Sequence, residues 1–312
     1  MNVHWQGVIP AITTPFDDRH RVDERFFAEH ARWVVEHGCT GLVPIGSLGE
    51  SATLDASEKR RVLEVCVDAV GNRVPIIPGI AALGTGEAVA LARDAKAIGC
   101  SGLMVLPPYV YSTDWREMKA HVHAVISATD LPCMLYNNPV AYKTDFLPQQ
   151  IAELARELPN LQAVKESSTD VRRVTAIRAL LADRIRVLVG VDDAIVEAIG
   201  AGAAGWIAGL VNAFPAESVA LYRYAVEGRR DEAFALYRWF LPLLRMDTVP
   251  KFVQLIKLAQ ERVGMGSSRV RPPRLPLAGD ELVEATAALD RALATRPALH
   301  AEAILEQATA TA

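Results

Sequence analysis

The chain has 312 residues, of which 51% are apolar and 22% are charged. This apolar share excludes a mainly disordered chain. The 33 basic and 37 acidic side chains leave no cationic surplus for a phosphate backbone, so we expect no nucleic-acid partner. There is no run of about 18 apolar residues, and the first residues lack the basic-then-apolar pattern of a signal peptide. We therefore expect a cytoplasmic protein that does not enter a membrane.

The four cysteines, Cys39, Cys66, Cys100 and Cys133, are far apart and lie in apolar segments. A disulfide framework needs a denser set in a smaller secreted chain, and a zinc site needs closely spaced pairs. The pattern predicts four buried free thiols.

Short runs rich in Val, Ile and Leu recur about every 30 residues, separated by segments with helical periodicity. These runs are Val8–Thr13, Gly41–Ile45, Val74–Gly79, Gly102–Leu106, Pro132–Tyr136, Leu161–Lys165, Ile185–Gly190 and Gly205–Ala208. Runs without polar alternation are typical of strands covered on both faces of a parallel sheet. Eight such strands alternating with helices predict an α/β protein, a (β/α)₈ TIM barrel.

A doubly wound open sheet is the alternative fold, because counting strands does not show closure. The turn after the first run, residues 14–18, lacks the G-x-G-x-x-G phosphate cradle that this fold often carries. Beyond residue 214 the strand pattern stops, and four helices are predicted at Pro215–Glu227, Arg230–Met246, Pro250–Val263 and Gly279–Leu293. We expect a catalytic barrel over residues 1–214 and a C-terminal helical extension over residues 215–312.

Catalytic residues of this kind of barrel lie at the carboxyl ends of its strands. Lys165 is the one lysine that directly follows an apolar strand run. Burying an ammonium is costly, and the loss of solvation favours the neutral, nucleophilic amine. The alternative is a structural lysine paired with Glu166 or a neighbouring carboxylate.

Two further strand ends carry candidate groups. Tyr136 ends the fifth run, and a phenol there could move protons to and from a carbinolamine on a neighbouring lysine. Gly46–Glu50 follows the second run, and its glycines would allow backbone N–H groups to turn inward and hold a carboxylate. We take Glu50 as structural, fixing this loop or the following helix.

The histidine pair gives no metal site. His121 and His123 are two residues apart in a predicted helix, so their side chains point in nearly opposite directions. Gly84-Thr-Gly86 opens a helix, but such a short glycine pattern is common in loops.

Four short motifs follow four of the predicted strands: Gly46-Ser-Leu-Gly-Glu-Ser, Tyr136-Asn-Asn-Pro, Lys165-Glu-Ser and Gly190-Val-Asp-Asp. In order and spacing they resemble the dihydrodipicolinate synthase/N-acetylneuraminate lyase family. The resemblance implies a TIM barrel with a helical C-terminal domain, and a homotetramer built as a dimer of dimers. It also implies a Schiff base between the lysine and a 2-oxo acid, often pyruvate, with no metal or organic cofactor.

The resemblance assigns roles by motif. Lys165 would form the Schiff base and Tyr136 would shuttle protons. The backbone N–H groups of Ser47 and Leu48 would hold the substrate carboxylate, and the Ser47 hydroxyl would stand in the proton relay. Tyr109 matches the tyrosine that many members insert into the site of a neighbouring subunit.

Four other positions match residues that line the pocket in this family. They are Gly190 and Ile207, together with Asp192 and Asp193, which in some members face the far end of the substrate. For the two aspartates the alternative is capping of the next helix.

The departures from the family pattern bear on the substrate. Lysine-biosynthesis synthases typically carry an arginine two residues after the proline of the Tyr-Asn-x-Pro motif, where this chain has Ala141. Losing a bidentate guanidinium disfavours that synthase role. Leu48 replaces the second hydroxyl of the usual pair, which alters the proton relay.

The loop sequences most resemble members that degrade hydroxyproline. Those convert 1-pyrroline-4-hydroxy-2-carboxylate to 2-oxoglutarate semialdehyde, with release of ammonia and loss of the 4-hydroxyl as water, so the best prediction is this deaminase. The alternatives are 4-hydroxy-tetrahydrodipicolinate synthase and a pyruvate-dependent aldolase acting on 2-keto-3-deoxy sugar acids or N-acetylneuraminate. A non-catalytic oxo-acid-binding protein is the alternative of another class.

Overall fold

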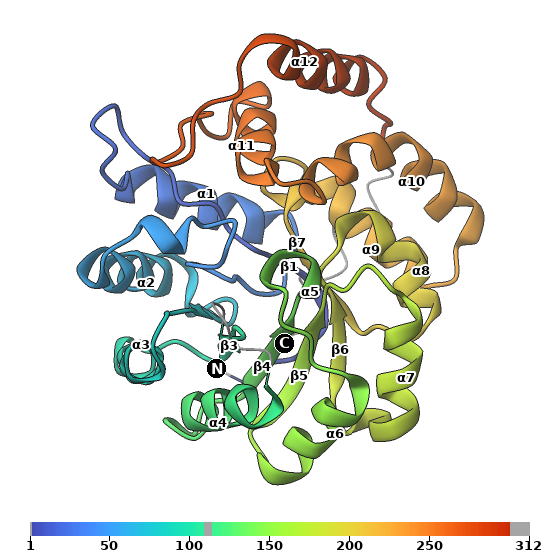
Figure 1. The fold of residues 1–312 in the computed structure, drawn as a ribbon. Helices are drawn as coiled ribbons and strands as arrows, with labels where there is room; N and C mark the ends of the chain where they lie inside the picture. Colours follow the sequence, from blue (N-terminus) through green and yellow to red (C-terminus); the bar gives the residue numbers. More distant parts are fainter. Residues whose placement is uncertain (1, 109–113, 300–312) are drawn as a thin grey trace.

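The protein is described by a computed structural model over residues 2–108 and 114–299. Its strands are β1 (Gly7–Pro10), β2 (Gly79–Ile80), β3 (Leu103–Val105), β4 (Cys133–Asn137), β5 (Leu161–Glu166), β6 (Arg186–Val189) and β7 (Gly205–Ala208). They form one parallel sheet in the order β1-β7-β6-β5-β4-β3-β2. Helices surround this curled sheet (Figure 1).

The ring is completed by the segment at residues 41–45, which was predicted as the second strand. Single parallel bridges join Val43 to Ala11 after β1, and Leu42 to Ile76 before β2. Backbone hydrogen bonds continue the pairing on both sides. The N–H groups of Leu42 and Val43 donate to the Pro75 and Pro10 carbonyls at 3.0 and 2.8 Å, and the Pro44 carbonyl accepts from the N–H of Gly79 at 2.9 Å. The predicted (β/α)₈ barrel is thus confirmed, and the open-sheet alternative was wrong.

The helices that follow the strands form the outer layer. They are α1 (Glu24–Glu36), α2 (Ala56–Val70), α3 (Thr85–Ile98), α4 (Trp115–Ile126), α6 (Pro148–Glu157), α7 (Arg172–Leu181), α8 (Ile195–Gly200) and α9 (Pro215–Val226). A four-residue helix, α5 (Pro139–Tyr142), follows β4. Short 3-10 helices lie at η1 (Ser51–Thr53), η2 (Ala182–Arg184), η3 (Asp192–Ala194) and η4 (Leu210–Asn212).

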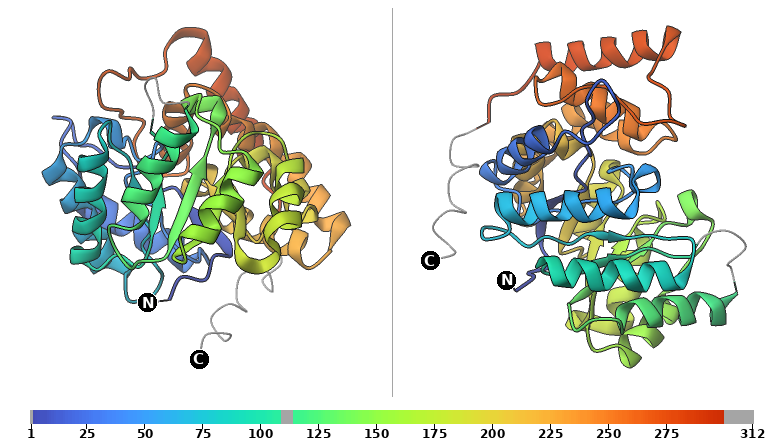
Figure 2. Two further views of the ribbon diagram at one scale, coloured as in Figure 1. Left: turned by 60° about the horizontal axis from the view of Figure 1, so that its bottom comes forward. Right: turned by 90° about the vertical axis from the view of Figure 1, so that its left-hand side faces the viewer.

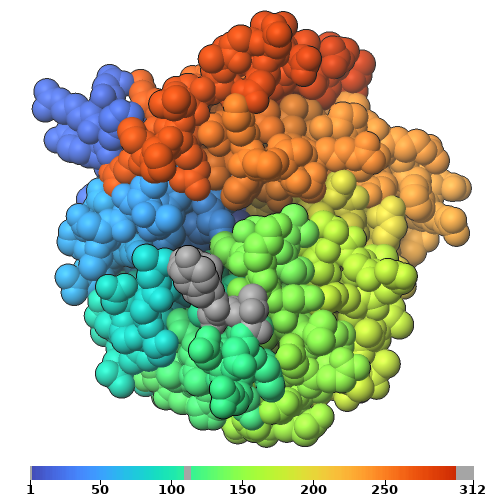
Figure 3. Space-filling view, in the orientation of Figure 1, coloured from blue at the N-terminus to red at the C-terminus, as the bar shows by residue number. Residues whose placement is uncertain are grey.

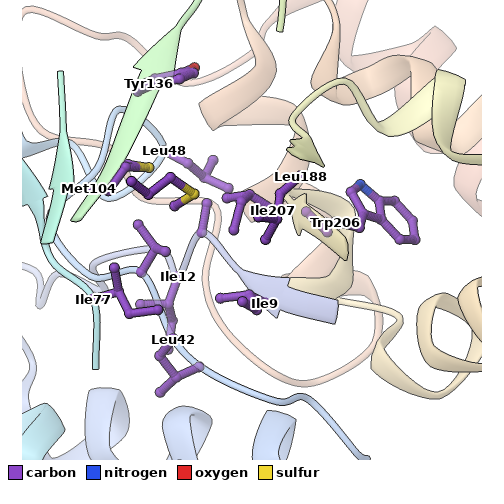
Figure 4. Close-up of a cluster of buried hydrophobic side chains, with 14 of the residues drawn as sticks. Ile9, Ile12, Leu42, Leu48, Ile77, Met104, Tyr136, Leu188, Trp206 and Ile207 are labelled. Carbon is purple, nitrogen blue, oxygen red and sulfur yellow. The ribbon is translucent and has the colours of Figure 1, made fainter. Parts of the chain in front are cut away.

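Apolar side chains fill the barrel interior. Figure 4 shows Ile9, Leu42 and Ile77 toward one end of this cluster and Tyr136 at the other. The three aliphatic side chains are fully buried. The polar phenol therefore lies where the apolar filling of the barrel ends, which is the end expected to carry the active site.

Three long helices extend beyond the barrel: α10 (Arg230–Leu244), α11 (Phe252–Arg262) and α12 (Gly279–Ala294), with the 3-10 helix η5 (Arg245–Asp247) between the first two. They gather along one side of the rounder barrel body (Figures 2 and 3). The four helices predicted after residue 214 are confirmed, and the first of them, α9, packs against β1 and α8. The division into residues 1–214 and 215–312 stays a prediction.

All four cysteines are buried free thiols, as predicted. Among the described residues, no helix has the length and apolar character needed to cross a bilayer.

Candidate active site

Lys165 and Tyr136 lie side by side on neighbouring strands. The two residues are paired in the register of β4 and β5. The Lys165 Nζ lies 4.1 Å from the centre of the Tyr136 ring. Both residues are buried, with exposed fractions of 7% and 5%. The structure thus brings together the predicted nucleophile and the predicted proton shuttle.

Glu166 does not neutralise Lys165. Successive strand residues point to opposite faces, and Glu166 accepts hydrogen bonds from Asn137 Nδ2 at 3.1 Å and from the N–H of Ser168 at 2.7 Å. Burial raises the pKa of the Glu166 carboxyl. Within the described residues, no carboxylate lies within 4.0 Å of Lys165. The ion-pair alternative for this lysine was therefore wrong.

Gly190 makes room for the lysine. A Cβ added to Gly190 would lie 2.3 Å from Lys165 Cε and 2.2 Å from Ser167 Oγ. No side chain fits there without displacing the lysine, so the predicted pocket glycine lies directly against the Lys165 side chain.

The Gly46–Glu50 loop leaves donors unpaired. Ile45 adopts a left-handed conformation with φ of 49°, a backbone geometry that turns successive N–H groups to one side. In the described part of the chain, neither the Ser47 nor the Leu48 N–H donates a hydrogen bond. The Leu48 side chain is buried in the barrel core (Figure 4). Leu48 can therefore offer a substrate only its backbone, consistent with a carboxylate cradle.

Glu50 fixes this loop to the C-terminal extension, which is the structural role predicted for it. Its carboxylate accepts from Lys257 Nζ of α11 at 2.5 Å and from the N–H of Arg271 at 3.1 Å. Both charged side chains are almost fully buried, with exposed fractions of 0% and 2%. The C-terminal extension thus holds the loop that carries the candidate anion cradle.

Tyr142, for which the sequence analysis gave no role, lies in the site. Its hydroxyl forms a hydrogen bond with Ser47 Oγ, and its ring packs edge-on against the Tyr136 ring with centroids 5.7 Å apart. The short helix α5 carries Tyr142 at its last position and Ala141, which is exposed, one residue earlier. An N-cap signal was available in the sequence, since Asn138 precedes Pro139.

The two aspartates after β6 have different environments. Asp192 is fully buried and accepts from Trp206 Nε1 at 2.9 Å and from the N–H groups of Gly209 and Leu210. It holds the turn after β7 rather than capping its own helix. Asp193 faces the C-terminal extension, with Oδ2 3.6 Å from Arg245 Nε.

A second carboxyl reaches Asp192 from the extension. Asp247 of η5 lies against Gly209, where an added Cβ would be 1.9 Å from Asp247 Oδ1. Burial raises the pKa of both acids, to about 6 for Asp192, and the negative charge of Asp192 adds to the rise for Asp247. The charge of Lys165 acts in the opposite direction on both. Asp247 was missed because only the folded extension brings it here.

Two predicted site residues remain. Ile207 is buried, with its side chain in the barrel interior (Figure 4). Tyr109 lies outside the described residues. Among those described, no three His, Cys, Asp or Glu side chains are arranged to hold a metal ion.

Comparisons with known proteins agree with this geometry. The sequence model of the Dihydrodipicolinate synthetase family matches residues 4–292. The 4-hydroxy-tetrahydrodipicolinate synthases of Methanosphaerula palustris and Agrobacterium fabrum are 35% and 33% identical to the chain. Each match covers 93% of this chain, together with 99% and 97% of the respective relatives.

Solved structures give the same result. The 4-hydroxy-tetrahydrodipicolinate synthase of Methylacidiphilum fumariolicum superposes with a TM-score of 0.89 at 28% identity, covering 93% of this chain and 96% of that one. A prophage protein of the dihydrodipicolinic acid synthase family from E. coli K12, solved in complex with pyruvate, has a TM-score of 0.87 at 26% identity. That match covers 93% of this chain and 99% of the other.

Proposed function

Because the chain belongs to the Dihydrodipicolinate synthetase family and is a Schiff-base-forming lyase, we propose that Lys165 condenses with C2 of a 2-oxo acid or of its cyclic imine. The best candidate substrate is 1-pyrroline-4-hydroxy-2-carboxylate, which the enzyme would deaminate. No metal or organic cofactor takes part in this proposal.

The observation that carries the substrate proposal is which residues α5 places beside Ser47. This helix places Ala141 and Tyr142 at its C-terminal end beside Ser47, and the cation that follows, Lys143, donates from Nζ to the Val140 carbonyl of the same helix at 3.0 Å. The candidate anion cradle is formed by the N–H groups of Ser47 and Leu48. One cradle suits a substrate with a single carboxylate, whereas the synthase reaction must hold two, one on pyruvate and one on the aldehyde.

The reaction balances with this set of groups. The Lys165 amine attacks C2 of the ring imine, Tyr136 gives a proton to the ring nitrogen, and the C2–N ring bond breaks to leave a C5 amine. The new iminium acidifies C3–H, and the 4-hydroxyl leaves as water after protonation. Proton transfer from C5 to C3 gives an enamine with a C4–C5 double bond, and transfer of an N–H proton to C4 then yields a C5 imine.

Hydrolysis completes the cycle. One water releases ammonia from C5, and a second water releases the C2 carbonyl from Lys165. Because dehydration returns one water, the net reaction consumes one water and releases one ammonia for each 2-oxoglutarate semialdehyde formed.

The synthase is the second candidate. It is favoured by the names of the relatives from Methanosphaerula palustris and Agrobacterium fabrum. Purified protein should be supplied separately with the hydroxypyrroline carboxylate, with pyruvate plus aspartate semialdehyde, and with a 2-keto-3-deoxy sugar acid. Ammonia release from the first substrate supports the deaminase, whereas turnover of either other substrate without ammonia release replaces it.

The Schiff base has its own test. The protein is incubated with pyruvate or with the imine, reduced with borohydride and weighed intact. We expect an adduct that maps to Lys165 and disappears in Lys165→Ala. An unmodified wild-type mass with both compounds would refute the lysine mechanism.

We propose a homotetramer built as a dimer of dimers, in which Tyr109 approaches a neighbouring site. The support is the family itself, in which a monomeric dihydrodipicolinate synthase variant was described as the first of its kind. Light scattering after size exclusion tests this directly: four chains are expected, and a monomer would contradict it.

A further inference from the structure

The active site contains two phenols from a single chain. Tyr136 lies beneath Lys165, and Tyr142 contacts both the Tyr136 ring and the Ser47 hydroxyl. The family pattern that this chain resembles has one such phenol in cis and takes the second from a neighbouring subunit, at the position of Tyr109. Tyr142 is therefore an additional hydroxyl in direct contact with the candidate proton relay.

One asparagine fixes both phenols. Asn138 Nδ2 donates to the Tyr136 hydroxyl oxygen at 2.9 Å, and Asn138 Oδ1 accepts from the N–H of Ala141 at 3.0 Å. The second contact caps α5, and the N–H of Tyr142 closes the helix on the Asn138 carbonyl at 3.0 Å. Because the amide donates to the Tyr136 oxygen, the phenol proton of Tyr136 remains available for another acceptor.

The helix is held at its other end as well. Lys143 ends it in a left-handed conformation with φ of 61°, and Lys143 Nζ donates to the Val140 carbonyl at 3.0 Å. The next residue, Thr144, is buried and donates to the Pro108 carbonyl at 3.0 Å. Tyr142 is thus carried on a short helix fixed at both ends rather than on a free loop, as a group that handles protons requires.

The geometry points to Tyr142 as the second phenol of the proton relay, supplied by the same chain as Lys165. Tyr142 holds the Ser47 hydroxyl beside the carboxylate cradle and, with Ser47 and Tyr136, carries the proton that leaves the Lys165 amine on attack and reaches the ring nitrogen as the C2–N bond breaks. The relay proposed here is then complete within one subunit. This inference rests on the proposed Schiff-base function.

Three tyrosine-to-phenylalanine variants of the full chain test this inference: Tyr142→Phe, Tyr109→Phe and the control Tyr224→Phe. Tyr224 is buried in α9, and its hydroxyl makes no hydrogen bond among the described residues, so Tyr224→Phe removes a hydroxyl outside the site. The probe is pyruvate labelled with ¹⁸O at C2, whose label is lost each time the Schiff base forms and hydrolyses. Rates and KM are measured across pH 6–9, with thermal midpoints as the folding control.

A relay group contributes about 10²-fold or more to proton transfer, whereas a group that only packs the site does not. We expect Tyr142→Phe to lose about 10²-fold in the maximal exchange rate with KM changed less than about threefold, and to alter the pH profile. The control Tyr224→Phe should stay within about threefold of wild type, and Tyr109→Phe should lose less than Tyr142→Phe.

The inference is overturned if Tyr142→Phe loses less than about tenfold, or if Tyr109→Phe loses as much as Tyr142→Phe. Failure of the proposed function looks different, because the wild-type protein itself would then neither exchange the label nor form a borohydride adduct.

Discussion

The buried ion pair between Glu50 and Lys257 makes a strong prediction about the loop that carries the candidate anion cradle. Lys257 Nζ also donates to the Arg269 carbonyl at 2.8 Å and lies 4.4 Å from the centre of the Phe16 ring. Burial lowers the pKa of Lys257 to about 8, although the Glu50 carboxylate acts to raise it. Desolvation therefore outweighs the attraction between the two charges.

The perturbation is Lys257→Met, which keeps most of the side-chain volume and removes the charge. It leaves the Glu50 carboxylate buried, with the Arg271 N–H at 3.1 Å and the Arg274 guanidinium at 3.6 Å as its remaining partners. Breaking a buried pair by removing one partner costs about 3–5 kcal/mol. At about 2 °C per kcal/mol for a chain of this size, the thermal midpoint should fall by roughly 6–10 °C.

Calorimetry at fixed protein concentration is done on Lys257→Met, Glu50→Gln and the double variant. The three losses of unfolding free energy give the interaction energy of the pair, apart from the contacts of each residue with its surroundings. The double variant should be destabilised by at least about 2 kcal/mol less than the sum of the two single variants, because it leaves no uncompensated charge. Additive losses, or a loss below about 1 kcal/mol for Lys257→Met, would refute the assignment of a buried, coupled pair.

Three further variants test other contacts. Gly190→Ala should reduce borohydride-trapped adduct formation at Lys165 by about 10²-fold with unchanged circular dichroism, because its Cβ would lie 2.3 Å from Lys165 Cε; a wild-type rate would show that the lysine is not confined there. Asn138→Ala should lower the rate of imine turnover by about tenfold or more, since it frees the Tyr136 phenol and uncaps α5 together; full activity would exclude this positioning role. Asp247→Asn should change the pH dependence of the thermal midpoint. A carboxyl whose pKa is raised on folding stabilises the protein below its unfolded pKa of about 4 and loses that contribution as pH rises through the folded value. The thermal midpoint of the variant should therefore rise relative to wild type between pH 4.5 and 7.5, the range that includes the pKa of about 6 at Asp192, and a difference that does not widen would contradict the raised pKa of Asp247.

The barrel was predictable because its strands are continuous apolar runs and its helices carry local stop and start signals. The capping box at Asp55 and Glu58 was readable from the sequence and is present, with both reciprocal hydrogen bonds. The second strand was placed correctly in the ring, where Leu42 and Val43 form backbone hydrogen bonds with the segments on both sides.

The site was predictable only in part. Lys165 and Tyr136 could be identified because each ends a strand, and the register of a parallel sheet brings such ends together. Tyr142 lies six residues beyond Tyr136 on a helix of four residues, so its position depends on the cap at Asn138 and not on strand periodicity. Asp247 lies 55 positions after Asp192 in the sequence, and only the packing of η5 on the turn after β7 brings the two carboxyls together.

The C-terminal extension acts on the site through contacts with three different barrel loops. Lys257 of α11 neutralises Glu50 below the Ser47 cradle. Asp247 of η5 packs on the turn after β7. Tyr237 of α10 donates from its hydroxyl to the Asp193 carbonyl after β6. Because each contact fixes a loop at the end of the barrel where Lys165 lies, the extension holds loops of the candidate site in place and does not only cover apolar surface. The boundary at residue 214 stays a prediction: α9, which lies beyond it, packs on β1 in the outer layer of the barrel, and the loop of the candidate cradle is held by Glu50 and Lys257 from the two sides of that boundary.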